Sequence, residues 1–311
     1  MSYAIRTISG VEDFRLPDAP PLDAALGRLL ESGATRREWC FVVARDGVDV
    51  GRVAFRVDDT CPPELLGDLP PREVFVHGLW LPWGDPSHLE AGRFLLERAR
   101  ERLRADLPET FQAIVNRAND EHAEARCAVL EAAGYGLFQE KQGFTWTRGA
   151  SPTPPPSGRL RFVSLDEVGH ERYRQVLGAV GEGTLDRNDA WYRAKAGEEN
   201  WGKVFMTFLG PDDAKSWLLA TLPDGEPVGM VAVGPLEEGT ATIVFVGVLP
   251  AHRGNGYIDD LVRAGTQAAE ARGFASMLSD ADVLNVPMTT AFERNGHRAD
   301  ARPWHKWHYR L

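Results

Sequence analysis

An uninterrupted apolar run late in the chain limits the available folds more than any other feature. Residues 240–249 read TATIVFVGVL, with apolar residues at nearly every position rather than at every second one. Such a strand is buried on both faces, as in a sheet that helices cover on each side. A segment with apolar residues at helical spacing follows at 256–272. Together they predict a mixed α/β fold.

A proline-rich stretch divides the chain of 311 residues into halves of nearly equal length. Residues 149–158 read GASPTPPPSG, which cannot fill a core and is typical of an extended linker. The halves open alike, with IRTIS at 5–9 and LRFVS at 160–164. We therefore expect domains at 1–148 and 159–311 with a duplicated architecture, although chance similarity of short strands is an alternative.

Periodicity and turn residues predict the same order of elements in both halves. The first half has expected strands at 3–8, 40–46, 48–57, 73–81 and 111–116, and helices at 87–105 and 119–133. The second has expected strands at 159–164, 216–222, 227–234, 240–249 and 275–281, helices at 166–181, 186–208, 256–272 and 285–295, and a final strand pair. Residues 87–90, Ser-His-Leu-Glu, match a capping box at a helix start.

Composition narrows the class of partner. The net charge is −10, which argues against a general nucleic-acid binder and is compatible with a cationic substrate. No apolar stretch approaches the roughly 20 residues that cross a bilayer, and the first residues lack a signal-peptide pattern. Cys40, Cys61 and Cys127 have no metal-site spacing and suggest packing thiols. We expect a cytoplasmic monomer or homodimer without nucleic-acid, membrane or metal partners.

The glycine turn between the apolar strand and the next helix is a candidate anion site. Residues 252–257 read HRGNGY. Backbone N–H groups at a helix start lack intrahelical partners and favour an anion, and Arg253 can add a two-pronged charged donor. A purely structural turn is the alternative. Neither a Walker loop nor a dinucleotide-binding turn fits, because the Gly-Lys-Ser/Thr pattern is absent and the turn follows a late strand.

These residues resemble a known family when they are taken with the stretches that follow. VGVLPAHRGNG at 246–256, DVLNVPM at 282–288 and FERNGH at 292–297 are similar to the Gcn5-related N-acetyltransferases (GNAT), in particular to members with two such domains in tandem. The resemblance implies two acyl-CoA N-acyltransferase-like domains. Each would be a mixed, mostly antiparallel sheet of six to seven strands flanked by helices. It covers the second half well and reaches the first only through the order of elements.

The resemblance implies acetyl-coenzyme A (acetyl-CoA) as co-substrate. Its amide-bearing arm would lie between two diverging strands and pair with the backbone of the apolar strand. Its pyrophosphate would bind the N–H groups of the glycine turn. The implied contact residues are Val246, Gly247, Val248, Arg253, Gly254, Asn255, Gly256, Tyr257, Ile258 and Asn285.

Three departures from the family pattern weaken the expected site. Ile258 stands where a small residue usually lets the phosphate approach. Asp259 and Asp260 follow in the first helical turn and would repel a phosphate within ~5 Å. Phe292 stands where many members have a tyrosine that protonates the leaving thiolate.

The first half lacks the glycine turn. Its equivalent stretch, LWLPWGDPSHLE at 79–90, has no arginine, and Pro82 and Pro86 have no N–H to donate. Asp85 adds negative charge. We expect this half to have lost cofactor binding and to serve as scaffold, interface or substrate wall.

Acetyl transfer needs an oxyanion donor and a base. The backbone N–H of Val248 or a neighbour is the expected donor. The favoured base is Asp280, near the end of the fifth predicted strand, and its alternative role is a turn cap or solvated charge. His297 is a weaker candidate base. Tyr309 is a candidate acid, but an aromatic packing role is favoured for it.

The acceptor pocket is expected to involve Trp191, Tyr192 and Glu198, which lie where helices wall the acceptor site in this family. Each has a structural alternative, either in the core or on an exposed helix face.

The sequence thus predicts an N-acetyltransferase that uses its second domain to acetylate a primary amine of a small molecule, such as an amino sugar, polyamine or antibiotic-like compound. The alternatives are a non-catalytic protein that binds a metabolite or partner, and an acyltransferase that uses a longer acyl-CoA.

Overall fold

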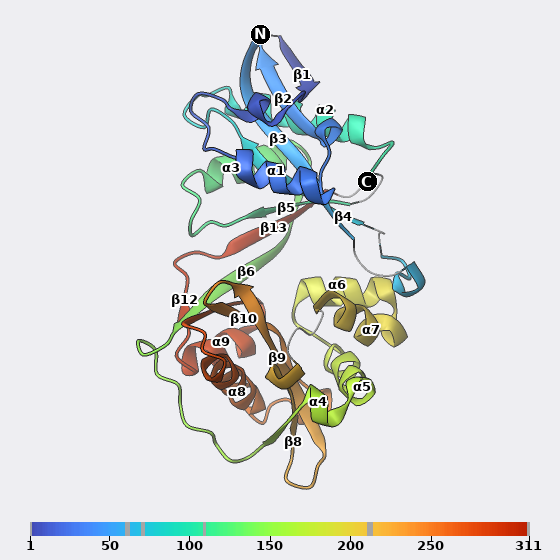
Figure 1. The fold of residues 1–311 in the computed structure, drawn as a ribbon, viewed down its shortest axis with the longest axis vertical. Coiled ribbons are helices and arrows are strands. Elements are labelled where there is room, and N and C mark those ends of the chain that lie inside the picture. The colour runs from blue at the N-terminus through green and yellow to red at the C-terminus, as the bar shows by residue number, and fades with distance from the viewer. Residues whose placement is uncertain (1, 60–62, 70–71, 108–109, 210–213, 310–311) are drawn as a thin grey trace. The chain divides into compact units, whose positions relative to one another are not determined.

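The computed structural model describes residues 2–59, 63–69, 72–107, 110–209 and 214–309, and the chain divides into two units (Figure 1). Unit 1 consists of Met1–Thr60, Pro70–Gln139 and Trp304–Leu311, and unit 2 of Cys61–Leu69 and Glu140–Pro303. Cys61 lies outside the described residues. None of the helices in these described ranges is long and apolar enough to span a membrane.

Unit 1 contains a mixed sheet with the strand order β1-β2-β3-β4-β5-β13, in which only β4 and β5 run parallel. Its strands are β1 (Tyr3–Thr7), β2 (Cys40–Arg45), β3 (Val48–Asp59), β4 (Arg72–Trp80), β5 (Phe111–Val115) and β13 (Trp304–Tyr309). Its helices are α1 (Asp23–Ser32), α2 (His88–Leu103) and α3 (Ala123–Ala132). The main core joins one face of the sheet to α2 and α3.

Unit 2 repeats this plan with the strand order β6-β11-β10-β9-β8-β7, in which only β10 and β11 run parallel. Its strands are β6 (Gly136–Thr147), which begins in unit 1, β7 (Arg161–Ser164), β8 (Trp217–Thr221), β9 (Pro227–Glu237), β10 (Thr240–Val248), β11 (Ser276–Asp282) and the short β12 (Arg298–Ala299). Its helices are α4 (Leu165–Val168), α5 (His170–Val180), α6 (Arg187–Ala196), α7 (Glu198–Leu209), α8 (Tyr257–Ala271) and α9 (Val286–Arg294).

Helices cover both faces of the unit 2 sheet, as the apolar run at 240–249 predicts. One core packs the sheet against α8 and α9, and a second packs it against α5, α6 and α7. On α8 the side chains of Leu261, Val262 and Ala269 are fully buried, because they recur on one helical face. The prediction of a mixed α/β fold with a mostly antiparallel sheet flanked by helices is confirmed.

The unit ranges differ from the predicted domain ranges, 1–148 and 159–311, at the segment Cys61–Leu69, which belongs to unit 2, and at two strands. Residues 140–147 of β6 precede the linker yet pair with β11 in unit 2, where Trp146 is fully buried. Strand β13 ends the chain yet pairs with β5 in unit 1, where Trp307 is in the core. Each half of the sequence therefore supplies one strand to the unit formed mainly by the other half.

Three local predictions were wrong. The helices expected at 166–181 and 186–208 are each broken by a glycine with positive φ, Gly169 at 81° and Gly197 at 83°, with ψ near 150°. Such values are almost restricted to glycine. The capping box at the start of α2 does not form, because the Ser87 hydroxyl accepts a hydrogen bond from Arg45 instead. Helix α1 was not expected.

Candidate functional site

Strands β10 and β11 diverge soon after they begin. They pair only through Thr240 with Ser276 and Ala241 with Met277. A register shift between Ile243 and Phe245 then marks a bulge at Val244 on β10. A bulge re-aims the strand and often lies next to a functional site. The gap therefore opens beside β10 at the level of Val244.

The backbone of β10 faces this gap. The N–H of Leu249 donates to the Val228 carbonyl of β9 at 2.8 Å. Because backbone groups alternate in direction along a strand, the N–H groups of Val246 and Val248 point away from β9. The Val248 carbonyl is likewise not paired with β9, since it accepts a hydrogen bond from Arg253 Nε at 3.1 Å. The predicted strand edge is present at both valines.

The glycine turn leads into α8 in a conformation that requires glycine. Gly254 has φ 82° and Gly256, the N-cap of α8, has φ 72°. Both values lie in the left-handed region, where other residues are strained. The N–H groups at the start of α8 lack intrahelical partners and lie at the positive end of the helix dipole. The turn has the geometry of an anion site.

Both aspartates of this turn are neutralised. Asp260 is buried and pairs with Arg159 at 2.5 Å and with Arg263 at 3.1 Å. Asp259 pairs with Arg294 at 3.5 Å. The repulsion expected from the sequence is reduced, because each carboxylate has a cation beside it.

Arg159 and Arg294 were missed by the sequence analysis. Arg159 donates to the Asn255 and Gly256 carbonyls at 3.0 and 3.2 Å, so it fixes the turn from the end of the linker. The Arg294 side chain is 68% exposed and lies beside the α8 start. No local pattern marks either arginine, since both reach the turn from distant positions in the sequence.

The side chain of Arg253 has a different role from the predicted one. Its guanidinium donates to the carbonyls of Val180, Glu182 and Gly183 at 3.0, 2.6 and 3.2 Å, as well as to Val248. It therefore ties the end of α5 to the end of β10. The prediction of a two-pronged phosphate donor does not fit this arrangement, and only the Arg253 backbone faces the turn.

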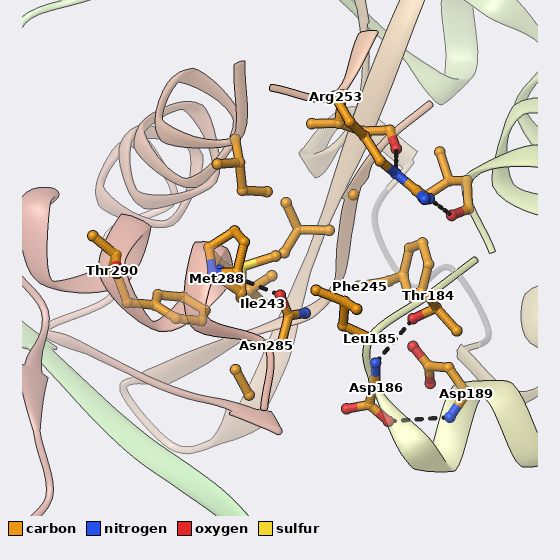
Figure 2. Close-up of a pocket in the computed structure, with 18 of the residues that line it drawn as sticks. Thr184, Leu185, Asp186, Asp189, Ile243, Phe245, Arg253, Asn285, Met288 and Thr290 are labelled. Atoms are coloured by element: carbon orange, nitrogen blue, oxygen red, sulfur yellow. Dashed lines mark hydrogen bonds between the residues drawn. The ribbon is translucent and has the colours of Figure 1, made fainter. Parts of the chain in front are cut away.

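A cavity of about 860 Å³ occupies the gap and reaches the start of α8 (Figure 2). Asn285, Met288 and Thr290 line its α9 side, while Leu185, Asp186 and Asp189 line the opposite side. The predicted site residues in its walls are Val246, Gly247, Val248, Arg253, Gly254, Gly256, Tyr257, Ile258, Asp280 and Asn285. Of the predicted cofactor contacts, Asn255 alone is outside the walls, and its side-chain amide donates to the His252 and Arg253 carbonyls.

Ile258 does not close the cavity. Its side chain is partly buried against the core between the sheet and α8, and it contributes one wall. The loss of a small residue at this position therefore narrows the site without blocking it.

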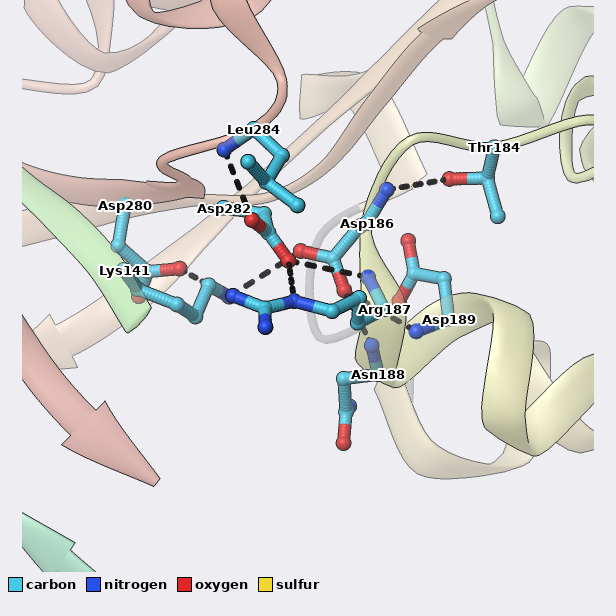
Figure 3. Close-up of polar contacts among 9 residues, drawn as sticks. All are labelled: Lys141, Thr184, Asp186, Arg187, Asn188, Asp189, Asp280, Asp282 and Leu284. Carbon is cyan, nitrogen blue, oxygen red and sulfur yellow. Dashed lines mark hydrogen bonds and ion pairs between the residues drawn. The ribbon is translucent and has the colours of Figure 1, made fainter. Parts of the chain in front are cut away.

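Asp280 lies at the point where the gap opens. The pairing of Ala241 with Met277, continued along both strands, places Asp280 level with Val244. Its carboxylate forms an ion pair with Lys141 of β6, and Lys141 is also 3.7 Å from Asp186 (Figure 3). Burial lowers the pKa of Lys141, but the charges of Asp280 and Asp186 outweigh it, so the net pKa is well above its usual value. Lys141 is therefore an ammonium that bridges two carboxylates.

The three predicted acceptor residues are outside the cavity walls. Tyr192 is buried in the core between the sheet and α5–α7, and Trp191 packs against the same core and against Tyr192. Glu198 has a side chain that is 78% exposed and pairs with Arg193 at 3.1 Å. The alternative roles, in the core or on an exposed helix face, therefore describe these three residues better than a role in the acceptor pocket does. The residues that do line this side belong to the loop before α6 and to the first turn of α6, and sequence patterns gave no reason to select them.

Phe292, His297 and Tyr309 offer no proton donor in the cavity. Phe292 lines the cavity but stacks on Phe144, with ring centroids 4.9 Å apart. His297 is buried, and its Nε2 is 2.9 Å from the Thr266 hydroxyl. Burial lowers the pKa of His297 to about 4. Tyr309 belongs to unit 1, where it packs against Tyr135.

Unit 1 has the strand gap but not the turn. Strands β4 and β5 pair only at two positions, and a cavity of about 480 Å³ lies there. Residues 82–90 do not line it. At the start of α2, the Asp85 carboxylate accepts the Ser87 N–H at 2.8 Å, which helps to hold the pKa of Asp85 below its usual value. The Asp85 carboxylate is thus an anion already present at the start of α2.

Within the described ranges, no group of three or more His, Cys, Asp or Glu side chains is arranged to hold a metal ion.

Comparison with known protein families matches residues 183–297 to the acetyltransferase (GNAT) family. This part of unit 2 resembles a GNAT domain. The match begins in the loop before α6 and includes both diverging strands, the glycine turn and α9. A comparison with curated protein sequences gave no match.

Several solved structures share the fold over both units. A GCN5-related N-acetyltransferase from Sphaerobacter thermophilus has a TM-score of 0.65 at 18% identity, and the similarity covers 99% of this chain and 95% of that one. A tandem GNAT protein from the clavulanic acid biosynthesis pathway has a TM-score of 0.54 at 14% identity, covering 99% and 98%. A GCN5-related N-acetyltransferase from Kribbella flavida has a TM-score of 0.54 at 15% identity, covering 94% and 96%. The GNAT resemblance predicted from the sequence is confirmed.

Proposed function

We propose that this chain is an N-acetyltransferase in which the GNAT domain transfers an acetyl group from acetyl-CoA to a primary amine of a small molecule. The observation that supports it best is that one cavity joins an exposed strand edge to an anion-binding helix start. Acetyl-CoA has a matching layout, with an amide-bearing arm and a diphosphate.

The residues present fit this co-substrate. The N–H groups of Val246 and Val248 suit the amides of the arm, in a form of strand addition. The N–H groups at Asn255–Ile258 suit the diphosphate, and Arg294 adds an exposed cation at the same end. When bound, acetyl-CoA supplies the activated acyl group.

In the transfer, the amine nitrogen bonds to the thioester carbonyl carbon and the carbon–sulfur bond breaks. The amine loses a proton, and the thiolate leaves with the bonding electrons. The N–H of Val248 or a neighbour at the gap is suited to hold the carbonyl oxygen as it becomes negative. Because a thiolate is only weakly basic, it can leave near neutral pH without an acid in the position of Phe292.

The proton from the amine needs a carboxylate on the cavity wall. Asp280 is placed for this, and its carboxylate forms an ion pair with Lys141. Asp189, in the first turn of α6, is the second candidate. Both act on the same side of the cavity, so the amine is expected there.

Coenzyme A release tests the proposal. The full chain with acetyl-CoA should release free thiol only when an amine is added, and acetyl-CoA should raise the melting temperature. Stabilisation without release for any amine would favour the non-catalytic alternative. Faster turnover with a longer acyl-CoA would favour the longer-chain acyltransferase. A melting temperature unchanged at millimolar acetyl-CoA would contradict the proposal.

A further inference from the structure

The side of the cavity beside α6 combines negative charge with apolar surface. Asp186, Asp189 and Asp280 line it together with one cation, Lys141. Three carboxylates and one ammonium leave an excess of negative charge. Lys141 lies between Asp280 and Asp186 and also interacts electrostatically with Asp189, which lies one helical turn beyond Asp186 (Figure 3).

Asp186 is committed to the local structure. As the N-cap of α6, its Oδ1 accepts the N–H groups of Asn188 and Asp189 at 2.9 and 3.1 Å. This cap fixes the first turn of the helix and hence the position of Asp189. Asp189 is therefore held on the wall by a rigid helix start.

The surface next to these carboxylates is apolar. Phe205 and Phe245 line the cavity with ring centroids 4.8 Å apart. Leu185 on this side and Val286 on the α9 side also line the cavity, and these residues are 52% and 61% exposed. Large apolar side chains that remain exposed inside a cavity indicate a ligand that covers them.

We propose that the acceptor is a hydrophobic primary amine, an alkylamine or arylalkylamine with one ammonium group. Its cation is held by Asp189 and the neighbouring carboxylates, and its apolar part covers Leu185 and Val286 against Phe205 and Phe245. This rests on the proposed acetyl transfer and narrows its substrate class.

The other acceptor classes fit these walls less well. The hydroxyls of an amino sugar would lose water against Phe245, Phe205 and Leu185 without gaining hydrogen-bond partners there. A polyamine would place a second and third ammonium along the same apolar surface, at a similar cost.

Isothermal titration of the full chain, with and without coenzyme A, tests binding separately from turnover. The ligands are 2-phenylethylamine, its neutral analogue 2-phenylethanol, glucosamine and spermidine. We expect 2-phenylethylamine to bind at least tenfold more tightly than each of the other three. Equal binding of 2-phenylethanol would overturn the role of charge. Equal or tighter binding of glucosamine or spermidine would overturn the role of the apolar wall, and so would no binding of 2-phenylethylamine.

Variants assign the roles of the side chains. Asp189→Asn should weaken 2-phenylethylamine binding at least tenfold and leave acetyl-CoA binding unchanged. Asp166→Asn is the matched control, because it removes one carboxylate from the exposed first turn of another unit 2 helix, α4, and should change neither. Leu185→Asn should weaken 2-phenylethylamine and not glucosamine. An Asp189→Asn protein that behaves like the control contradicts the assignment.

If 2-phenylethylamine binds as expected but no thiol is released from acetyl-CoA, the amine site stands and the proposed transfer fails. If thiol is released with glucosamine alone, the transfer stands and this acceptor class fails.

Discussion

A single buried imidazole makes the stability of unit 2 sensitive to acid. Burial lowers the pKa of His297 from 6.5 to about 4. Between these values the unfolded chain binds a proton that the folded chain does not, so acid favours unfolding. The contribution is fully present above pH 6.5 and is lost as the pH falls towards 4. The free energy of unfolding falls by about 3 kcal/mol in total, because a shift of one pKa unit corresponds to about 1.36 kcal/mol.

Melting temperatures of the native chain and of His297→Gln, measured between pH 7.5 and 4.5, check this prediction. Carboxylates that titrate in both proteins cancel in the comparison. The variant should start less stable but lose less stability on acidification. Parallel curves would show that His297 is already protonated or exposed in the folded state.

At the same scale, the sequence predicts backbone requirements better than side-chain direction. Gly254 and Gly256 were selected as the turn, and both have positive φ. Arg253 was assigned to phosphate, but its guanidinium caps carbonyls at the end of α5. The turn follows from residue type, whereas the partner of a long side chain depends on elements that only tertiary structure brings together.

If the start of α8 binds the diphosphate, a side chain added there should weaken acetyl-CoA binding more than a side chain added at the end of the helix. Gly256 and Gly273 flank the two ends of this helix, with φ 72° and 90°. Alanine at either position adds strain of about 1–2 kcal/mol. We expect both variants to lose similar stability, but only Gly256→Ala to weaken acetyl-CoA binding, by tenfold or more, in a titration calorimetry experiment.

A similar loss of affinity in Gly273→Ala and Gly256→Ala would trace the effect to general destabilisation of α8. Unchanged affinity in Gly256→Ala would place the diphosphate elsewhere.

Strands and the longest helices were predictable because their apolar periodicity is strong. Strand β10 and helix α8 agree with their predicted ranges to within one residue at each end. The breaks at Gly169 and Gly197 were not, because a glycine within a helical pattern is compatible with a continuous helix until its φ is known. Asp186 caps α6 and Asp189 lies in its first turn, so both stood at the start of the helix predicted over 186–208, where no local pattern marks the side that faces the cavity.

The exchange of strands between the sequence halves determines which unit a core mutation affects. Trp146 precedes the linker but is buried in unit 2, and Trp307 follows the linker but is buried in unit 1. Each Trp→Ala change should cost about 3–5 kcal/mol. Hydrogen exchange should rise in β11 for Trp146→Ala and in β5 for Trp307→Ala.

The opposite assignment, with Trp146→Ala affecting β5 and Trp307→Ala affecting β11, would contradict the unit ranges. The two variants serve as controls for each other, because both remove an indole from a sheet core.

The duplicated architecture of the whole molecule was predictable from the linker and the repeated order of elements. The exchange of β6 and β13 was not, because both strands have the same alternation of aromatic residues. The sequence pattern of either strand suits either unit. The unit to which each strand belongs is therefore known only from its pairing with β5 or β11.

The central claim is that the diverging strands and glycine turn of unit 2 form an acyl-CoA site, and that unit 1 has none. Hydrogen exchange of the full chain with and without saturating acetyl-CoA measures both parts at once. We predict slower exchange at residues 244–260 and no change at residues 79–90. Protection at 79–90 with none at 244–260 would contradict the account.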